Sequence, residues 1–146
     1  MGMFGAIDAA ASGLTAERLR MDVISNNIAN ANTTRTAQGG AYKRQMVVFA
    51  PRESNEAFAQ VLSGKMNDEI GNGVRVVGIT KDSSPARRIY DPAHPDANRD
   101  GYVEMPNVNV VSEMVDMITS SRAYEANVTT INTAKSMALK ALEIGK

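Results

Sequence analysis

The chain has 146 residues, of which 43% are hydrophobic, and its sixteen basic residues balance its sixteen acidic ones. This balance argues against nucleic acid or an anionic membrane surface as the main partner, and the absence of cysteine excludes disulfides, thiolate metal sites and a cysteine nucleophile. No stretch approaches the roughly 18–20 apolar residues of a membrane span, and we expect no cleaved secretory signal, because the N-terminus lacks a basic region and a continuous apolar core.

The N-terminal segment has the residue spacing of a long helix. Two interleaved series, almost entirely apolar, recur at intervals of seven residues, which is typical of helices that pack along a seam. The series are Ile7, Leu14, Met21 and Ile28, and Ala10, Glu17, Ile24 and Ala31. They predict a helix from about Phe4 to Asn30, about 40 Å long at 1.5 Å per residue.

Two asparagines near the end of this predicted helix lie away from its apolar stripe. Asn26 and Asn30 stand two residues before and after Ile28, which places both about 200° from it around the helix. They are four residues apart and therefore stack on one face. A buried, register-setting role in the seam does not suit this pair. A solvated surface and amide hydrogen bonds to a neighbouring subunit are the two open interpretations.

The middle of the chain has the composition of short strands. Residues 41–51 (AYKRQMVVFAP) and 73–82 (GVRVVGITKD) contain β-branched runs bounded by glycine and proline. Residues 87–91 and 101–105 favour a further strand pair across the turn region from Pro92 to Gly101. Residues 53–66 are open between a short helix and a loop.

The C-terminal segment repeats the seven-residue pattern of the N-terminal one. Asn107 or Asn109 can cap the start of a helix, where Glu113 and Asp116 would lie near the positive end of the helix dipole. Gly145 fits the end of that helix. The two series are Met114, Ser121, Val128, Lys135 and Leu142, and Met117, Tyr124, Ile131 and Ala138.

These patterns predict an α+β fold. The terminal helices pair as a coiled-coil-like hairpin, and a small β-rich domain is inserted between them. The predicted divisions are an N-terminal helix over residues 1–33, a β-rich middle with connecting loops over 34–106, and a C-terminal helix over 107–146. The predicted seam between the helices consists of Ile7, Leu14, Met21, Ile24, Ile28, Met114, Met117, Tyr124, Val128, Ile131, Ala138 and Leu142. Two helices alone make a thin core, so we expect the ends to depend on neighbouring copies.

The sequence offers no set of residues that we interpret as an active site. Residues 96–103 (DANRDGYV) match the start of a calcium-binding loop, with Asp96, Asn98 and Asp100 in ligand positions. Asn107, however, stands where that loop needs a bidentate glutamate. His94 is the single histidine, and the sequence supplies neither an orienting partner nor a nucleophile for it. We therefore expect no catalysis, no metal and no cofactor.

Two segments resemble a known protein family. Residues 12–34 (SGLTAERLRMDVISNNIANANTT), followed by GAYKRQ at 40–45, are similar to the signature of bacterial flagellar rod and hook proteins. Residues 106–145 are similar to the proximal-rod members of that family, through the blocks RAYEANV and NTAKSMALKALEIG. The resemblance covers nearly the whole chain.

The resemblance implies a structural subunit of the flagellar basal-body rod, a drive shaft that lies in the cell envelope outside the cytoplasmic membrane and carries torque. It implies assembly with copies of the chain and with related rod proteins, export by the flagellar type III apparatus, and no nucleic-acid or small-molecule substrate. It favours Asn26 and Asn30 as assembly-interface residues. The alternatives are a soluble helical-hairpin adaptor or chaperone, a calcium-binding or hydrolytic module, and another rod subunit of the same family.

Overall fold

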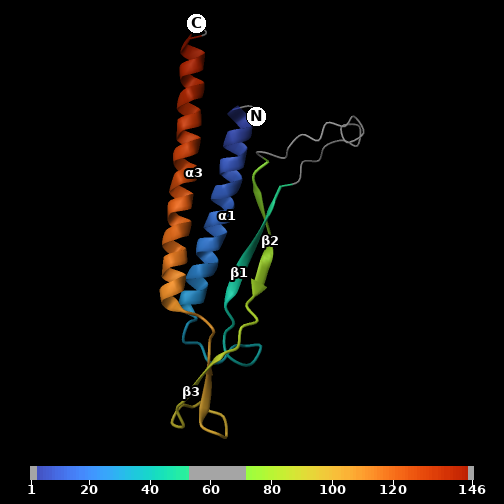
Figure 1. The fold of residues 1–146 in the computed structure, drawn as a ribbon, viewed down its shortest axis with the longest axis vertical. Coiled ribbons are helices and arrows are strands. Elements are labelled where there is room, and N and C mark those ends of the chain that lie inside the picture. The colour runs from blue at the N-terminus through green and yellow to red at the C-terminus, as the bar shows by residue number, and fades with distance from the viewer. Residues whose placement is uncertain (1–2, 53–71, 145–146) are drawn as a thin grey trace, which may run out of the picture. The chain divides into compact units, whose positions relative to one another are not determined.

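The computed structural model describes residues 3–52 and 72–144 and has the predicted α+β architecture. Two long helices stand at the ends of the described chain, and two small sheets are formed by the residues between them (Figure 1). The elements are α1 (Met3–Ala29), β1 (Gln45–Pro51), β2 (Val74–Lys81), β3 (Arg87–Tyr90), β4 (Tyr102–Met105) and α3 (Val110–Ile144). The helix predicted from about Phe4 to Asn30 is confirmed, whereas residues 53–66, open between helix and loop, lie outside the described residues.

Both predicted strand pairs are confirmed. Strands β1 and β2 form one two-stranded sheet. Hydrogen bonds at its two ends show that the strands run in opposite directions: the Arg52 amide donates to the Gly73 carbonyl at 3.1 Å, and the Asp82 amide donates to the Arg44 carbonyl at 2.8 Å. Strands β3 and β4 are antiparallel, with Ile89 opposite Val103.

The turn between β3 and β4 is built by local polar contacts. Asn98 Oδ1 accepts hydrogen bonds from the amides of Asp100 and Tyr102, and Gly101 has a φ of 80°, a conformation that suits glycine. In the segment that resembles a calcium-binding loop, Asp96 accepts a hydrogen bond from the Thr34 hydroxyl at 2.8 Å. Within the described residues, no group of three or more His, Cys, Asp and Glu side chains is placed to hold a metal ion.

The chain divides into two compact units, and each helix contributes a part to both. The first unit comprises residues 1–18, 49–77 and 122–146. In it, α1 and α3 approach each other closely at Gly13 and Asn127, because a Cβ added to Gly13 would lie 2.8 Å from the Asn127 side-chain nitrogen. Ser12 holds the beginning of β2, since its hydroxyl accepts a hydrogen bond from the Val74 amide at 3.0 Å.

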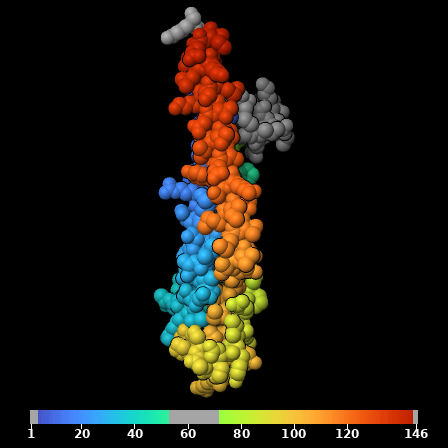
Figure 2. Space-filling view, turned by 90° about the vertical axis from the view of Figure 1, so that its left-hand side faces the viewer, coloured from blue at the N-terminus to red at the C-terminus, as the bar shows by residue number. Residues whose placement is uncertain are grey.

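The second unit comprises residues 19–48 and 78–121. Here the later part of α1 lies beside the beginning of α3 (Figures 1 and 2). Its buried residues are Val23, Ile24, Asn27, Ala31, Val103, Pro106, Glu113 and Ser120. Three of these are polar or charged, which is unusual for so small a core. In the described part of the chain, neither helix is long and apolar enough to cross a membrane.

Candidate functional site

The centre of the second unit is an asparagine whose hydrogen-bonding capacity is fully used. Asn27, on α1, is 1% exposed. Its amide nitrogen donates to the Gln45 carbonyl at 2.8 Å and to Glu113 Oε2 at 3.0 Å. Its Oδ1 accepts from the Gln45 amide and from the Tyr42 hydroxyl, both at 2.9 Å. Two donors and two acceptor positions are all that an asparagine amide offers, so Asn27 is satisfied without water.

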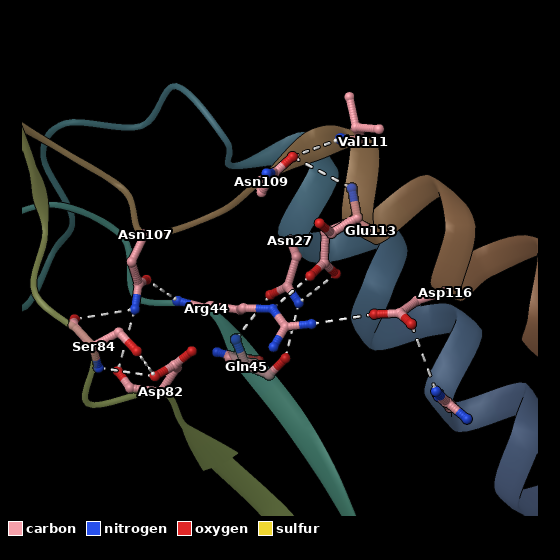
Figure 3. Close-up of polar contacts among 12 residues, drawn as sticks. Asn27, Arg44, Gln45, Asp82, Ser84, Asn107, Asn109, Val111, Glu113 and Asp116 are labelled. Atoms are coloured by element: carbon pink, nitrogen blue, oxygen red, sulfur yellow. Dashed lines mark hydrogen bonds and ion pairs between the residues drawn. The ribbon is translucent and has the colours of Figure 1, made fainter.

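An ion pair with a buried carboxylate lies against this asparagine (Figure 3). Glu113, at the start of α3, is 0% exposed. The guanidinium of Arg44 donates to Glu113 Oε1 at 2.5 Å and to Asp116 Oδ2 at 3.3 Å. Arg20, on α1, lies 3.9 Å from the other oxygen of Asp116. A buried carboxylate is tolerated only when a cation and hydrogen-bond donors satisfy it, and Glu113 has both.

The backbone of Arg44 connects this pair to the rest of the unit. Its amide donates to Asn107 Oδ1 at 2.8 Å, and its carbonyl accepts from the Asp82 amide at 2.8 Å. The side-chain nitrogen of Asn107 in turn donates to the Ser84 carbonyl at 3.2 Å. We call the group of Asn27, Tyr42, Arg44, Gln45, Asn107, Glu113 and Asp116 the polar junction. It joins α1, the start of β1, the end of β2 and α3 in one hydrogen-bonded network.

The start of α3 is capped by Asn109, one of the two predicted candidates. Asn109 Oδ1 accepts hydrogen bonds from the amides of Val111 at 3.0 Å and Ser112 at 3.3 Å. The other candidate, Asn107, holds Arg44 instead. The cap fixes the first turn of α3 and so positions Glu113 on the face that meets Asn27.

Two titratable groups at the edge of the junction have shifted pKa values. Burial, and secondarily the Glu113 carboxylate, raise the pKa of the Tyr42 phenol above its ordinary 10.0. Hydrogen bonds from the Ser84 hydroxyl and amide, together with the nearby Arg44 cation, lower the pKa of Asp82. Both shifts favour the protonation state that the network uses at neutral pH, which is a neutral phenol and an ionised aspartate.

The predicted seam residues differ in their exposure in the single chain. Ile24 is buried, and eight others are half-buried: Ile7, Leu14, Met21, Ile28, Met117, Tyr124, Ile131 and Ala138. Met114, Val128 and Leu142 are exposed, at 56%, 36% and 70%. The buried positions of α3 are instead Glu113, Ser120 and Ala134, which keep the seven-residue spacing one position earlier than the Met114 series. The use of the whole predicted set as a seam remains a prediction.

Asn26 and Asn30 lie next to each other, as their spacing suggests. Asn26 is exposed and Asn30 is half-buried. The Asn30 amide donates to both the side-chain and the backbone oxygen of Asn26, each at 2.9 Å. The Thr33 hydroxyl donates to Asn30 Oδ1 at 3.2 Å. Their role in assembly remains a prediction.

Sequence reasoning did not identify Asn27, Arg44 and Glu113 as functional residues. For Asn27 a signal existed: it stands three residues after Ile24 and four before Ala31, so it is a polar residue next to the apolar stripe of the helix. Glu113 was attributed to the helix dipole. Arg44 lies in the segment just before β1, and its partners follow only from the tertiary fold.

Comparisons with known proteins agree with this architecture. Residues 7–35 match the family described as flagella basal body rod protein, and residues 99–144 match the family described as flagellar basal body rod FlgEFG protein C-terminal. The flagellar basal-body rod protein FlgC of Borreliella burgdorferi (strain B31) is 56% identical over 149 residues, which cover 99% of this chain and 98% of the relative. The chain belongs to the FlgC family of flagellar basal-body rod proteins.

Other FlgC proteins match this chain over its full length. FlgC of Bacillus subtilis (strain 168) is 47% identical, and FlgC of Escherichia coli O157:H7 is 37% identical; the matches cover 100% of this chain and of each relative. The resemblance seen in the sequence is therefore confirmed. As a rod protein of this family, the chain is a component of the flagellar basal body and assembles with other rod proteins.

Proposed function

We propose that this rod protein is a structural subunit of the proximal rod that polymerises through its terminal helices into the torque-transmitting shaft. It reaches the rod by flagellar type III export, and it acts on no substrate and needs no cofactor. In this proposal, residues 1–33 and 107–146 form the axial part and residues 34–106 form the β-rich middle part. The related rod proteins and further copies of the chain are its neighbours.

One observation carries the proposal: large apolar side chains of α3 are exposed in the single chain. Val111, Val115 and Ile118 are exposed at 70%, 58% and 55%, and their spacing of four and three residues places them on one face of the helix. Met114 is exposed beside them. Apolar faces of this kind on a soluble chain mark a surface that another protein covers, and a helical stripe suits a helix of a neighbouring subunit.

The far end of α3 supports the same proposal. Met137, Leu139, Leu142 and Ile144 are exposed, at fractions from 52% to 87%. A helix that buries so little apolar surface within its own chain is marginal alone, and it gains stability when a neighbour binds the folded form. Helix ends that fold fully only on assembly also suit a chain that is exported before it assembles.

Asn26 and Asn30 are the proposed polar part of the assembly interface. Their mutual hydrogen bonds hold both amides on one outward face of α1, where donors and acceptors remain for a neighbouring chain. Substituting both by alanine should impair motility while the stability of the isolated chain is kept. Normal motility of the double variant would assign the pair to solvent.

The main test replaces exposed apolar residues of α3. The Val115→Ser, Ile118→Ser double variant should fold as a monomer with nearly unchanged thermal stability, because both side chains are already in water. It should be depleted from purified basal bodies and abolish swimming, whereas the exposed Thr119→Ser control behaves as wild type. Full incorporation of the double variant would show that this face of α3 is not an assembly surface. A well-folded soluble dimer that is absent from basal bodies would favour the adaptor alternative.

A further inference from the structure

We infer that the polar junction is a folding latch: in the second unit, α1 and α3 can pair only when residues 42–45 are docked against them. The helices are joined directly at the junction by the hydrogen bond between Asn27 and Glu113, which are 86 residues apart in sequence. Every other contact described above for these two side chains comes from the segment that leads into β1. This property goes beyond the proposed assembly role and is tested on the isolated chain.

Residues 42–45 supply most of the hydrogen bonds of Asn27. Three of the four come from this segment, two through the backbone of Gln45 and one through the Tyr42 hydroxyl. A pair of helices formed without the segment would bury the Asn27 amide with a single partner. Buried amide groups left without partners are costly, so this arrangement is disfavoured.

The charge of Glu113 also requires this segment. Its carboxylate is 0% exposed, and Arg44 makes the close ion pair with it. If the helices paired before Arg44 arrived, that charge would be buried without its cation. Removing one partner of a buried ion pair is strongly destabilising, because an uncompensated charge remains.

The segment itself is positioned by groups that lie far from it in the sequence. Arg44 is held through its backbone by Asn107, in the connection to α3, and by Asp82, at the end of β2. The latch therefore closes only when α1, the start of β1, the end of β2 and the start of α3 are all present. Two amphipathic helices could otherwise slide along each other in several registers, and a buried polar contact of this kind selects one register.

The test uses amide hydrogen exchange on the full-length monomer. In the Arg44→Met variant, amides of residues 23–29 and 113–120 should exchange faster together, on the order of a hundredfold, as expected for a broken buried ion pair. Arg52→Met is the matched control, because Arg52 forms an exposed ion pair with Asp8 at 3.0 Å, and it should leave these amides unchanged.

A second variant shows whether charge is the reason. Adding Glu113→Gln to Arg44→Met removes the uncompensated charge. The amides of residues 23–29 and 113–120 should then exchange at least tenfold more slowly than in Arg44→Met alone. If Arg44→Met fails to fold, recovery of folding in the double variant supports the latch and continued unfolding overturns it. The latch is also overturned if Arg44→Met leaves the helix amides as protected as Arg52→Met does, or if the double variant is no better than Arg44→Met alone.

Discussion

Replacing Asn27 by alanine should remove most of the stability of the second unit. The substitution deletes four hydrogen bonds and leaves the Gln45 amide, the Gln45 carbonyl, the Tyr42 hydroxyl and one oxygen of Glu113 without their partner. A buried polar group left unpaired costs about 1–3 kcal/mol. Because Gln45 and Tyr42 are only half-buried, water replaces part of the loss there, and the sum is about 3–4 kcal/mol.

A small gain opposes this loss. Alanine favours a helix over asparagine by about 0.5 kcal/mol, so the net destabilisation is about 3 kcal/mol. That is a large part of the roughly 5–15 kcal/mol that stabilises a typical domain. The measurement is urea unfolding of the monomer, followed by circular dichroism, with the slope m checked for constancy.

The neighbouring asparagine provides a matched control. Asn26 is exposed, and in the Asn26→Ala variant the Asn30 amide keeps its hydrogen bond to the backbone oxygen of residue 26. This variant should therefore lie within about 0.5 kcal/mol of wild type. If the free energy of unfolding of Asn27→Ala is less than about 1 kcal/mol below that of Asn26→Ala, the hydrogen bonds of Asn27 do not stabilise the unit.

Three further predictions concern single residues. The raised pKa of Tyr42 means that the neutral phenol stabilises the fold. This contribution to the free energy of unfolding is complete below pH 10 and is lost as the pH rises through the raised pKa. In the Tyr42→Phe variant, the free energy of unfolding measured against pH should lack this loss. The Ser120 hydroxyl is buried without a hydrogen-bond partner among the described residues, so Ser120→Ala should be neutral or stabilising by up to about 1 kcal/mol in urea unfolding; a clear loss would reveal an unseen partner. Gly73→Ala should lower the melting temperature more than Gly40→Ala. Both glycines have a positive φ, but only at Gly73 would the new Cβ overlap a neighbour, the Ser12 hydroxyl. Equal decreases in melting temperature would contradict this.

The elements of the fold followed from local patterns. The seven-residue series predicted both helices, and the β-branched runs bounded by glycine and proline predicted β1 and β2. The turn region from Pro92 to Gly101 favoured β3 and β4. All of these signals are properties of short segments. Asn109 as the cap of α3 was one of two candidates, and both lie in the same few residues. Choosing between them required knowing that Asn107 is engaged by Arg44.

The packing faces were harder to predict. Hydrophobic spacing drew attention to Met114 and Leu142, yet the α3 side chains buried in the single chain include Glu113 and Ser120. Small and polar residues allow the helices to approach closely around a hydrogen-bonded centre, whereas the bulky residues point outward. Hydrophobicity alone does not distinguish a face that meets the same chain from one that meets a neighbour, and in a subunit of a polymer both exist.

The candidate site could be predicted only in part. Asn26 and Asn30 were distinguished by their angle from the apolar stripe, and the same reasoning applied to Asn27 would have marked it as a buried polar residue. The ion pair of Arg44 with Glu113 joins residues 69 apart. No local pattern connects such residues, and the pair becomes visible only once β1 is placed beside the helices.

Amide hydrogen exchange of the wild-type monomer measures whether the polar junction stabilises the second unit while the far end of α3 becomes stable only when neighbouring subunits bind it. We expect strong and similar protection of residues 23–29 and 113–120, and fast exchange at residues 137–144, whose large side chains are exposed. Exchange of residues 113–120 as fast as that of residues 137–144 would contradict it, because the junction would then give the start of α3 no stability of its own.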